Sequence, residues 1–229
     1  MNWEITGQGG FGTLDIQLTA GERFFAQPRS LLQMTTGVEV TAKVGGNIDS
    51  GGVGAAFRGM LAGESFATAI YSASRAEQSL SLAPDVIGPI LSIELEPDRT
   101  LNIAKGSYLA NTDGVTLSTK FSGVKGILAK KGIFLIVASG AGTIFLTAAG
   151  DIRTIELGEG EKTVIDNDHV VAFDSTISYQ VVIAAKGLKD SVLSGEGLLI
   201  RYTGPGKVYF QTRKKARSGV FTSILNTMT

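Results

Sequence analysis

The sequence predicts an all-β protein, and the first observation behind this prediction is a period of two in its apolar residues. Apolar and polar side chains alternate in residues 14–18, 91–95 and 155–157. Because successive side chains of a strand point to opposite faces, such runs are typical of strands with one buried face. The second observation is the punctuation: 30 glycines and only 5 prolines in 229 residues indicate many tight turns rather than disorder.

The third observation is that the chain is similar to itself. Residues 16–40 align without a gap with residues 93–117 at a shift of 77, and these align with residues 155–179 at a further shift of 62. Each segment begins with an Ile-x-Leu motif and later contains an apolar pair, namely Leu31-Leu32, Tyr108-Leu109 and Val170-Val171. We therefore predict one compact domain of three internal repeats, at approximately 1–76, 77–150 and 151–215, followed by a tail at 216–229.

Two glycine motifs extend the similarity. GAGTIFLTA (residues 140–148) aligns with GPGKVYFQT (residues 204–212) at a shift of 64, and a similar apolar strand precedes each motif. Glycine adopts positive φ at low cost, so we predict that G-x-G is the turn between two antiparallel strands. Residues 63–71 give a weaker first version that lacks the G-x-G turn.

The strand after Gly206 supplies most of the interface or ligand candidates. We expect Val208 and Phe210 to face the core, which leaves the alternate side chains for a neighbouring subunit or a ligand, with the subunit favoured. Two glutamates at related strand starts and the arginine that ends the motif join them. The full set of candidates is Glu64, Glu196, Lys207, Tyr209, Gln211 and Arg213.

The composition narrows the classes of partner and the location. Lys+Arg and Asp+Glu are both 21, and this neutral balance argues against a general nucleic-acid binder. Charged residues are only 18% and the mean hydropathy is +0.19, which favours a homo-oligomer that hides apolar surface. The chain has no cysteine, no apolar run long enough to span a membrane and no signal-peptide pattern at its start, so a cytoplasmic location is expected.

No motif in the sequence predicts a catalytic residue or a bound cofactor. GQGGFG (residues 7–12) matches a dinucleotide-binding pattern, but a strand follows it where a helix is needed. The single histidine gives a weak metal candidate, Asp166, Asp168 and His169. The favoured alternative is a structural turn, because the self-alignment places Ser30 and Ser107 at the histidine position.

The tail combines a basic cluster, RKKAR (residues 213–217), with apolar residues at helical spacing in residues 220–228. It predicts a short C-terminal helix. Such a helix docks on its own domain or on a neighbouring subunit, which we favour, or lies on an anionic membrane.

Four segments resemble the family of the yeast altered inheritance of mitochondria protein, whose prokaryotic members were long catalogued as a domain of unknown function. They are RGMLAGESF (residues 58–66), GSYLANTDGVTLSTK (106–120), VIDNDHVVAF (164–173) and SGEGLLIRYTGPGKVYFQTR (194–213). The resemblance implies a fold like that of the trp RNA-binding attenuation protein: a small double-stranded β-helix unit, repeated three times in the chain. It further implies that three chains close into a ring of nine such units.

The leading expectation for function is a non-enzymatic, ring-forming trimer that acts as a scaffold or binding platform. A second expectation, by analogy with the attenuation protein, is an RNA or small-ligand binder; its candidate residues are Lys207, Tyr209, Arg213, Lys214 and Lys215. A third is a peripheral membrane protein that uses the tail. The family motif assigns no catalytic role to any residue of this chain.

Overall fold

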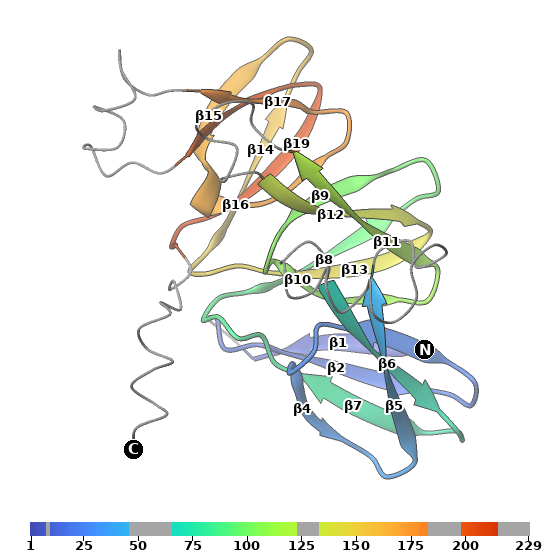
Figure 1. Ribbon diagram of the computed structural model, residues 1–229. Coiled ribbons are helices and arrows are strands. Elements are labelled where there is room, and N and C mark those ends of the chain that lie inside the picture. Colours follow the sequence, from blue (N-terminus) through green and yellow to red (C-terminus); the bar gives the residue numbers. More distant parts are fainter. Residues whose placement is uncertain (8–9, 46–65, 123–132, 183–197, 215–229) are drawn as a thin grey trace, which may run out of the picture.

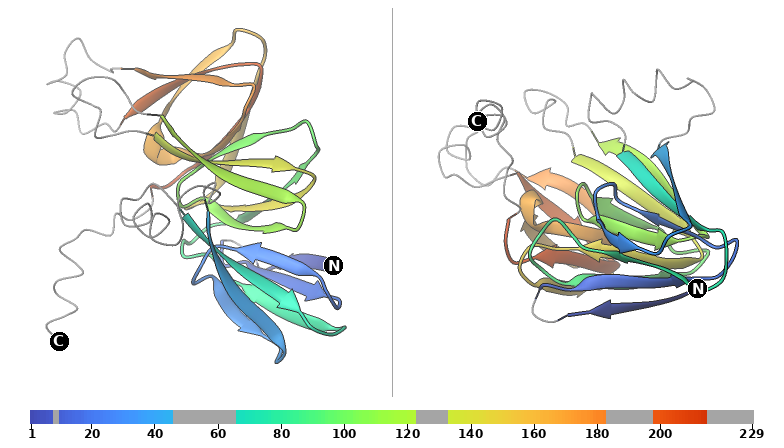
Figure 2. Two further views of the ribbon diagram at one scale, coloured as in Figure 1. Left: turned by 45° about the vertical axis from the view of Figure 1, so that its right-hand side comes forward. Right: turned by 90° about the horizontal axis from the view of Figure 1, so that it is seen from below.

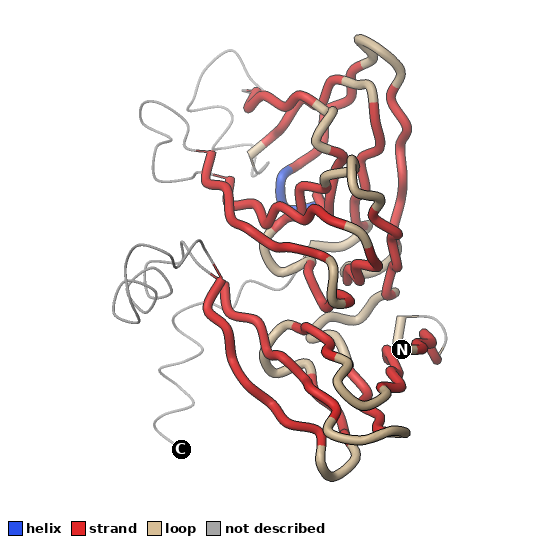
Figure 3. The backbone as a smooth tube through the Cα atoms, turned by 90° about the vertical axis from the view of Figure 1, so that its right-hand side faces the viewer, coloured by secondary structure: helices blue, strands red, loops and turns tan. Residues whose placement is uncertain are grey.

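The computed structural model describes residues 1–7, 10–45, 66–122, 133–182 and 198–214. Within these residues the chain forms nineteen strands in antiparallel sheets, and its one helical element is a 3-10 turn, Asn167–His169 (Figure 3). The predicted all-β class is confirmed. The predicted C-terminal helix lies outside the described residues.

Four sheets are arranged in sequence along the molecule (Figure 1). The first has the order β1-β2-β7-β4 and comprises β1 (Asn2–Thr6), β2 (Thr13–Leu18), β7 (Gln78–Leu82) and β4 (Leu31–Met34). The fourth has the order β15-β18-β17 and comprises β15 (Lys162–Asp166), β18 (Leu199–Thr203) and β17 (Ser178–Val182).

The two middle sheets have six strands each. The second sheet comprises, in spatial order, β5 (Val38–Gly45), β6 (Phe66–Ala73), β3 (Arg23–Ala26), β10 (Tyr108–Thr112), β13 (Gly142–Thr147) and β8 (Ile90–Leu95). The third comprises β11 (Val115–Ser122), β12 (Ile133–Gly140), β9 (Leu101–Ala104), β16 (Val170–Asp174), β19 (Gly206–Gln211) and β14 (Ile152–Leu157). At the centre of each, a strand from one third of the chain pairs with a strand from the next.

Three apolar cores hold successive sheets together, and the alternation of the sequence builds them. In β2, Leu14 and Ile16 are buried, whereas Asp15 between them points to the other face. The first core joins these residues to Phe24 and Phe145 of the second sheet. The second core contains residues of the second and third sheets, and the third core contains residues of the third and fourth. Figure 2 shows the resulting stack, with the first and fourth sheets at opposite ends.

The strand registers recur at the spacings found in the sequence. Ile16 lies opposite Leu80 in the β2–β7 pair, and Ile93 lies opposite Ile144 in the β8–β13 pair. The β14–β19 pair repeats this with Ile155 opposite Val208. The pairs β4–β7, β10–β13 and β16–β19 each contain a one-residue irregularity at the second residue of the strand.

The prediction that G-x-G turns back between two paired strands is wrong. β12 belongs to the third sheet and β13 to the second, so Gly140 and Gly142 carry the chain from one sheet to another. Both have positive φ, and a Cβ on Gly140 would overlap the carbonyl oxygen of Gly114. Glycine is needed here because a sharp corner packs against another turn.

The weaker first version of the glycine motif is also placed differently. Residues 66–73 form β6, which pairs with β3 and β5 as β12 pairs with β9 and β11. The counterpart of β13 in the first third is β7, because β7 pairs with β2 in the same way as β13 pairs with β8. By contrast, β1 and β2 form an antiparallel hairpin, so the segment that holds GQGGFG connects two strands, as expected.

Replacement of Gly140 tests the sheet-switching corner. Gly140→Ala should lower the free energy of unfolding by about 2 kcal/mol more than Gly160→Ala does, because a clash adds to the strain of positive φ. Gly160 is the matched control, since its φ is +74° but no atom lies within 4 Å of an added Cβ. Thermal unfolding at one protein concentration measures both; equal losses would contradict the proposed role of the corner.

Candidate functional site

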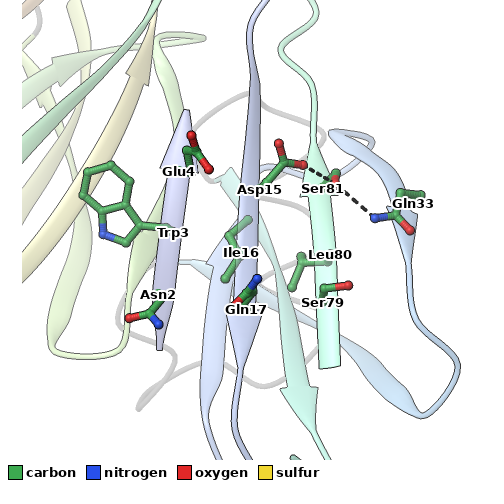
Figure 4. A pocket seen from close by; sticks show the side chains of 10 residues that line it. All are labelled: Asn2, Trp3, Glu4, Asp15, Ile16, Gln17, Gln33, Ser79, Leu80 and Ser81. Carbon is green, nitrogen blue, oxygen red and sulfur yellow. Dashed lines mark hydrogen bonds between the residues drawn. The ribbon is translucent and has the colours of Figure 1, made fainter. Parts of the chain in front are cut away.

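A polar pocket of about 350 Å³ lies on the first sheet (Figure 4). Its lining combines side chains from β1, β2, β4 and β7, which the register of the sheet brings side by side. The lining residues are Asn2, Trp3, Glu4, Asp15, Ile16, Gln17, Gln33, Ser79, Leu80 and Ser81. Sequence reasoning missed this pocket, because its strands are far apart in the chain.

Asp15 is the centre of the polar network in this pocket. Its carboxylate accepts hydrogen bonds from the hydroxyl groups of Ser81, Thr6 (2.6 Å) and Thr13 (3.2 Å). The Ser81 hydroxyl in turn accepts from Nε2 of Gln33 at 3.1 Å. The bond from Ser81, followed by that from Thr6, lowers the pKa of Asp15 below its ordinary value.

The chemistry of this network is that of a cross-strand clasp. A carboxylate with a lowered pKa stays ionised at neutral pH, whereas a general base works best with a pKa near the working pH. The three donors occupy the carboxylate of Asp15, and each belongs to this chain. The arrangement therefore ties β1, β2 and β7 together.

Ion pairs span the two junctions between successive thirds of the chain. Arg23 makes a bidentate pair with Asp113, with distances of 2.9 to 3.1 Å, beside the β3–β10 junction. In this pair a planar guanidinium matches a carboxylate. Arg99 donates from Nε and Nη2 to a single oxygen, Oδ1 of Asp174, at 3.1 and 2.9 Å, beside the β9–β16 junction. A second pocket lies against the first of these pairs and also contacts Met1, whose amino group pairs with Glu22.

The metal candidate has other partners in the structure. Asp166 accepts a hydrogen bond from the amide of Asp168 and pairs with Lys214 at 2.5 Å. Burial acts to raise the pKa of Asp166, but the hydrogen bonds from Lys214 and from the Asp168 amide, together with the nearby positive charge, lower the pKa below its ordinary value. Nδ1 of His169 lies 2.7 Å from the carbonyl oxygen of Gln211. Among the described residues, no three His, Asp or Glu side chains are grouped as a metal site would need.

The β19 candidates are distributed over both faces of a covered strand. Val208 is buried in the third core, and Phe210 packs against that core. Tyr209 is buried in the second core and its hydroxyl lies 3.2 Å from Nη2 of Arg99. Gln211 is buried, accepts a hydrogen bond from the Ala149 amide and donates one to the carbonyl of Asp168.

The remaining candidates are more exposed or lie outside the described residues. Lys207 is half-exposed and lies 3.9 Å from the carboxylate of Glu156. Arg213 is exposed at the end of the described chain. Glu64, Glu196 and Lys215 lie outside the described residues.

Several edge strands carry exposed apolar side chains, among them β4 and β15. Strand β4 ends the first sheet, and all four of its residues are exposed, including Leu31, Leu32 and Met34. Strand β15 ends the fourth sheet and exposes Val164. The signal for β4 was present in the sequence: the apolar pair Leu31-Leu32 aligns with pairs in the other two segments. The alignment could not reveal that this pair alone is uncovered.

The fold and these surfaces define an all-β protein of stacked antiparallel sheets. A family model described as mitochondrial biogenesis AIM24 matches residues 3–213, and the chain belongs to this family. An uncharacterised protein of Streptococcus pyogenes serotype M6 is 30% identical over 207 residues, which are 88% of this chain and 82% of that protein. The resemblance of the sequence to the altered inheritance of mitochondria family is thereby confirmed.

A solved structure agrees with the fold over nearly the whole chain. It is the X-ray crystal structure of a Streptococcus pyogenes protein, determined as a structural genomics target. The two chains are 25% identical and superpose with a TM-score of 0.74, over 99% of this chain and 97% of that one. Within the part of the chain that the structure describes, no helix is long and apolar enough to cross a bilayer.

Replacement of Ser81 tests the clasp around Asp15. Ser81→Ala should raise the pKa of Asp15 towards its ordinary value of 3.8, because the largest stabilising bond to the carboxylate is lost. A lowered pKa stabilises the native state above the unfolded-state pKa, and this contribution is lost as pH falls through the folded-state pKa. The variant should therefore lose stability at neutral pH and lose less on acidification. NMR titration of the Asp15 carboxyl measures the pKa.

Ser79→Ala is the matched control, because Ser79 lines the same pocket on the same strand but its hydroxyl does not bond Asp15. It should leave the pKa of Asp15 unchanged. An identical titration curve in both variants would show that Ser81 does not hold the carboxylate.

Proposed function

We propose that this protein is a non-enzymatic subunit of a trimeric ring, and that the ring acts as a scaffold or binding platform. The proposal includes an architecture of three repeats like the unit of the trp RNA-binding attenuation protein. It is supported by the strand registers, which recur at shifts of 77 and 62 along the first strand of each segment. Strands β8–β13 and β14–β19 each divide into three strands of one sheet and three of the next, and β2–β7 do the same, with β1 added at the edge of the first sheet.

The observation that carries the proposal is the unequal burial of one position. Leu32, Leu109 and Val171 occupy the irregular position of β4, β10 and β16. Leu109 is 1% exposed and Val171 is 0% exposed, because the preceding third of the chain covers each of them. Leu32 is 61% exposed, and none of the described residues covers it.

The same difference in burial holds for other residues of β4. Leu31 and Met34 are partly exposed, whereas Tyr108 and Asn111 at the matching positions of β10 are buried. Burial of one Leu side chain contributes about 1.5–3 kcal/mol, so several such residues favour association. The last third of another copy can cover this edge in the way that the preceding third covers β10 and β16 within the chain. Copies joined in this way form a ring when the rotation from one copy to the next closes.

The described chemistry favours a platform over an enzyme or an RNA binder. The Asp15 carboxylate accepts three hydrogen bonds from hydroxyl groups of this chain, and the Asp166–His169 segment is bonded as a turn. Base stacking needs an accessible aromatic ring, whereas Tyr209, the aromatic candidate for RNA binding, is buried. A platform needs only a stable, repeated outer surface, which a ring of identical chains provides.

The assembly is tested by a charge at the uncovered position. Wild-type protein should have the mass of a trimer in dilute solution, by light scattering or native mass spectrometry. Leu32→Asp should shift this mass to that of the monomer while the chain stays folded, because a carboxylate would replace a side chain that needs cover.

Ile87→Asp is the matched control, since Ile87 is similarly exposed but belongs to the segment between β7 and β8 rather than to β4 or β15. It should leave the trimer intact. A stable wild-type monomer at micromolar concentration would overturn the ring.

A further inference from the structure

We propose that β15 of one subunit pairs antiparallel with β4 of the next, in one defined register, and so forms the subunit junction. This inference rests on the proposed ring and adds the surface and the partner, a second copy of this chain. Both strands end their sheets with an unpaired side within the described residues (Figure 1). An unpaired edge is a template for strand addition, because its amide and carbonyl groups are free to bond another strand.

Two junctions of the required kind already exist inside the chain. In the first, β3 pairs with β10, with Phe25 opposite Asn111 and Ala26 opposite Ala110. In the second, β9 pairs with β16, with Asn102 opposite Phe173 and Ile103 opposite Ala172. The first shift of the self-alignment carries Phe25 to Asn102, and the second shift carries Asn111 to Phe173. The junctions are therefore equivalent in register.

The same shifts define the register of the junction between chains. Adding the second shift, 62, to the residue numbers of β9 gives the positions of β15. Subtracting the first shift, 77, from the residue numbers of β10 gives the positions of β4. The expected partners across the junction are Ile165 with Gln33, Val164 with Met34, and Thr163 with Thr35. Each residue of β15 in this set has its other side occupied by β18, so its pairing within the chain is retained.

Residues that are buried at the two internal junctions correspond to residues that are exposed on β4 and β15. Asn102 is 6% exposed, whereas Val164 at the same position of β15 is 49% exposed. Phe173 is 1% exposed, whereas Met34 at the same position of β4 is 38% exposed. Val164 and Met34 are thus apolar, uncovered and opposite each other in the expected register.

The backbone supplies a further bond at the same place. At the first internal junction, the amide of Gln27 donates to the carbonyl of Leu109 at 2.7 Å. The equivalent donor at the end of β15 is the amide of Asp166, and the equivalent acceptor is the carbonyl of Leu32. Strand β4 has the same one-residue irregularity as β10, which directs the carbonyl of that residue outward.

The junction between chains differs from the internal ones in charge. The internal junctions carry the ion pairs Arg23–Asp113 and Arg99–Asp174. The corresponding positions hold Glu161 just before β15 and Lys162 at its start, and Thr35 and Thr36 after β4. Without an ion pair, this junction depends on main-chain bonds and on the apolar side chains of β4 and β15.

The positions of the edges require a head-to-tail arrangement. Strands β4 and β15 lie at opposite ends of the stack (Figure 2). One chain therefore cannot pair its own two edges, and a symmetrical dimer would pair β4 with β4. Head-to-tail contacts use two different surfaces of each subunit and repeat until the assembly closes.

Cysteine cross-linking tests the register, because the chain has no cysteine of its own. Opposite residues of an antiparallel pair have Cα atoms about 4.5–5.5 Å apart, within the range of a disulfide. The double variant Met34→Cys, Val164→Cys should give a covalent trimer on denaturing gels after mild oxidation with copper phenanthroline. Each single variant alone should remain a monomer on the gel, and an equal mixture of the two should give covalent dimers.

Met34→Cys with Thr163→Cys is the matched control. A shift of one residue turns the side chain to the other face of the strand, so this pair should not cross-link. The mass of each reduced variant is measured first, which separates lost assembly from lost contact. A trimer without the Met34–Val164 cross-link would overturn this junction and leave the ring standing. Cross-linking of Met34→Cys with itself would likewise overturn it, and a wild-type monomer would overturn both proposals.

Discussion

Main-chain pairing between β3 and β10, and between β9 and β16, is the constraint on which the rest of the structure depends. Each pair joins strands from two different thirds of the chain, and each creates a six-stranded sheet from two sets of three. Neither six-stranded sheet is completed by one third of the chain alone. The cores follow from this arrangement, since a sheet shared by two thirds has a face towards each neighbouring sheet.

Sharing of sheets also explains where sequence reasoning succeeded. The alternation of Leu14, Ile16 and Leu18 predicts a strand with one buried face, and the structure buries all three. The gap-free self-alignment predicts which strands correspond, because equivalent residues keep the same spacing within the aligned segments. These features are local or periodic, and a single sequence displays both directly.

The failures concern the choice of strand partner, which no local pattern encodes. The G-x-G segments look like hairpin turns, but Gly140 and Gly142 lead from the third sheet back to the second. Alternation along β19 predicts that Tyr209 faces away from the core because Val208 faces it. A central strand between two layers has a core on each face, so both side chains are buried. The Asp15 pocket joins four strands from distant parts of the chain, which only the assembled sheet brings together.

Open edges are normally protected in monomeric β-proteins by charges, proline or a covering loop. Strand β4 has neither a charged residue nor a proline: its sequence is Leu-Leu-Gln-Met, and all four residues are exposed. The internal counterparts of this edge are covered, and the chain as a whole has few charges with which to protect a surface. A sequence that keeps apolar residues at an unprotected edge, in the register of its own internal junctions, favours cover by an identical partner over exposure to water. The lysine at the start of β15 then lies at the rim of the junction, where its charge stays hydrated.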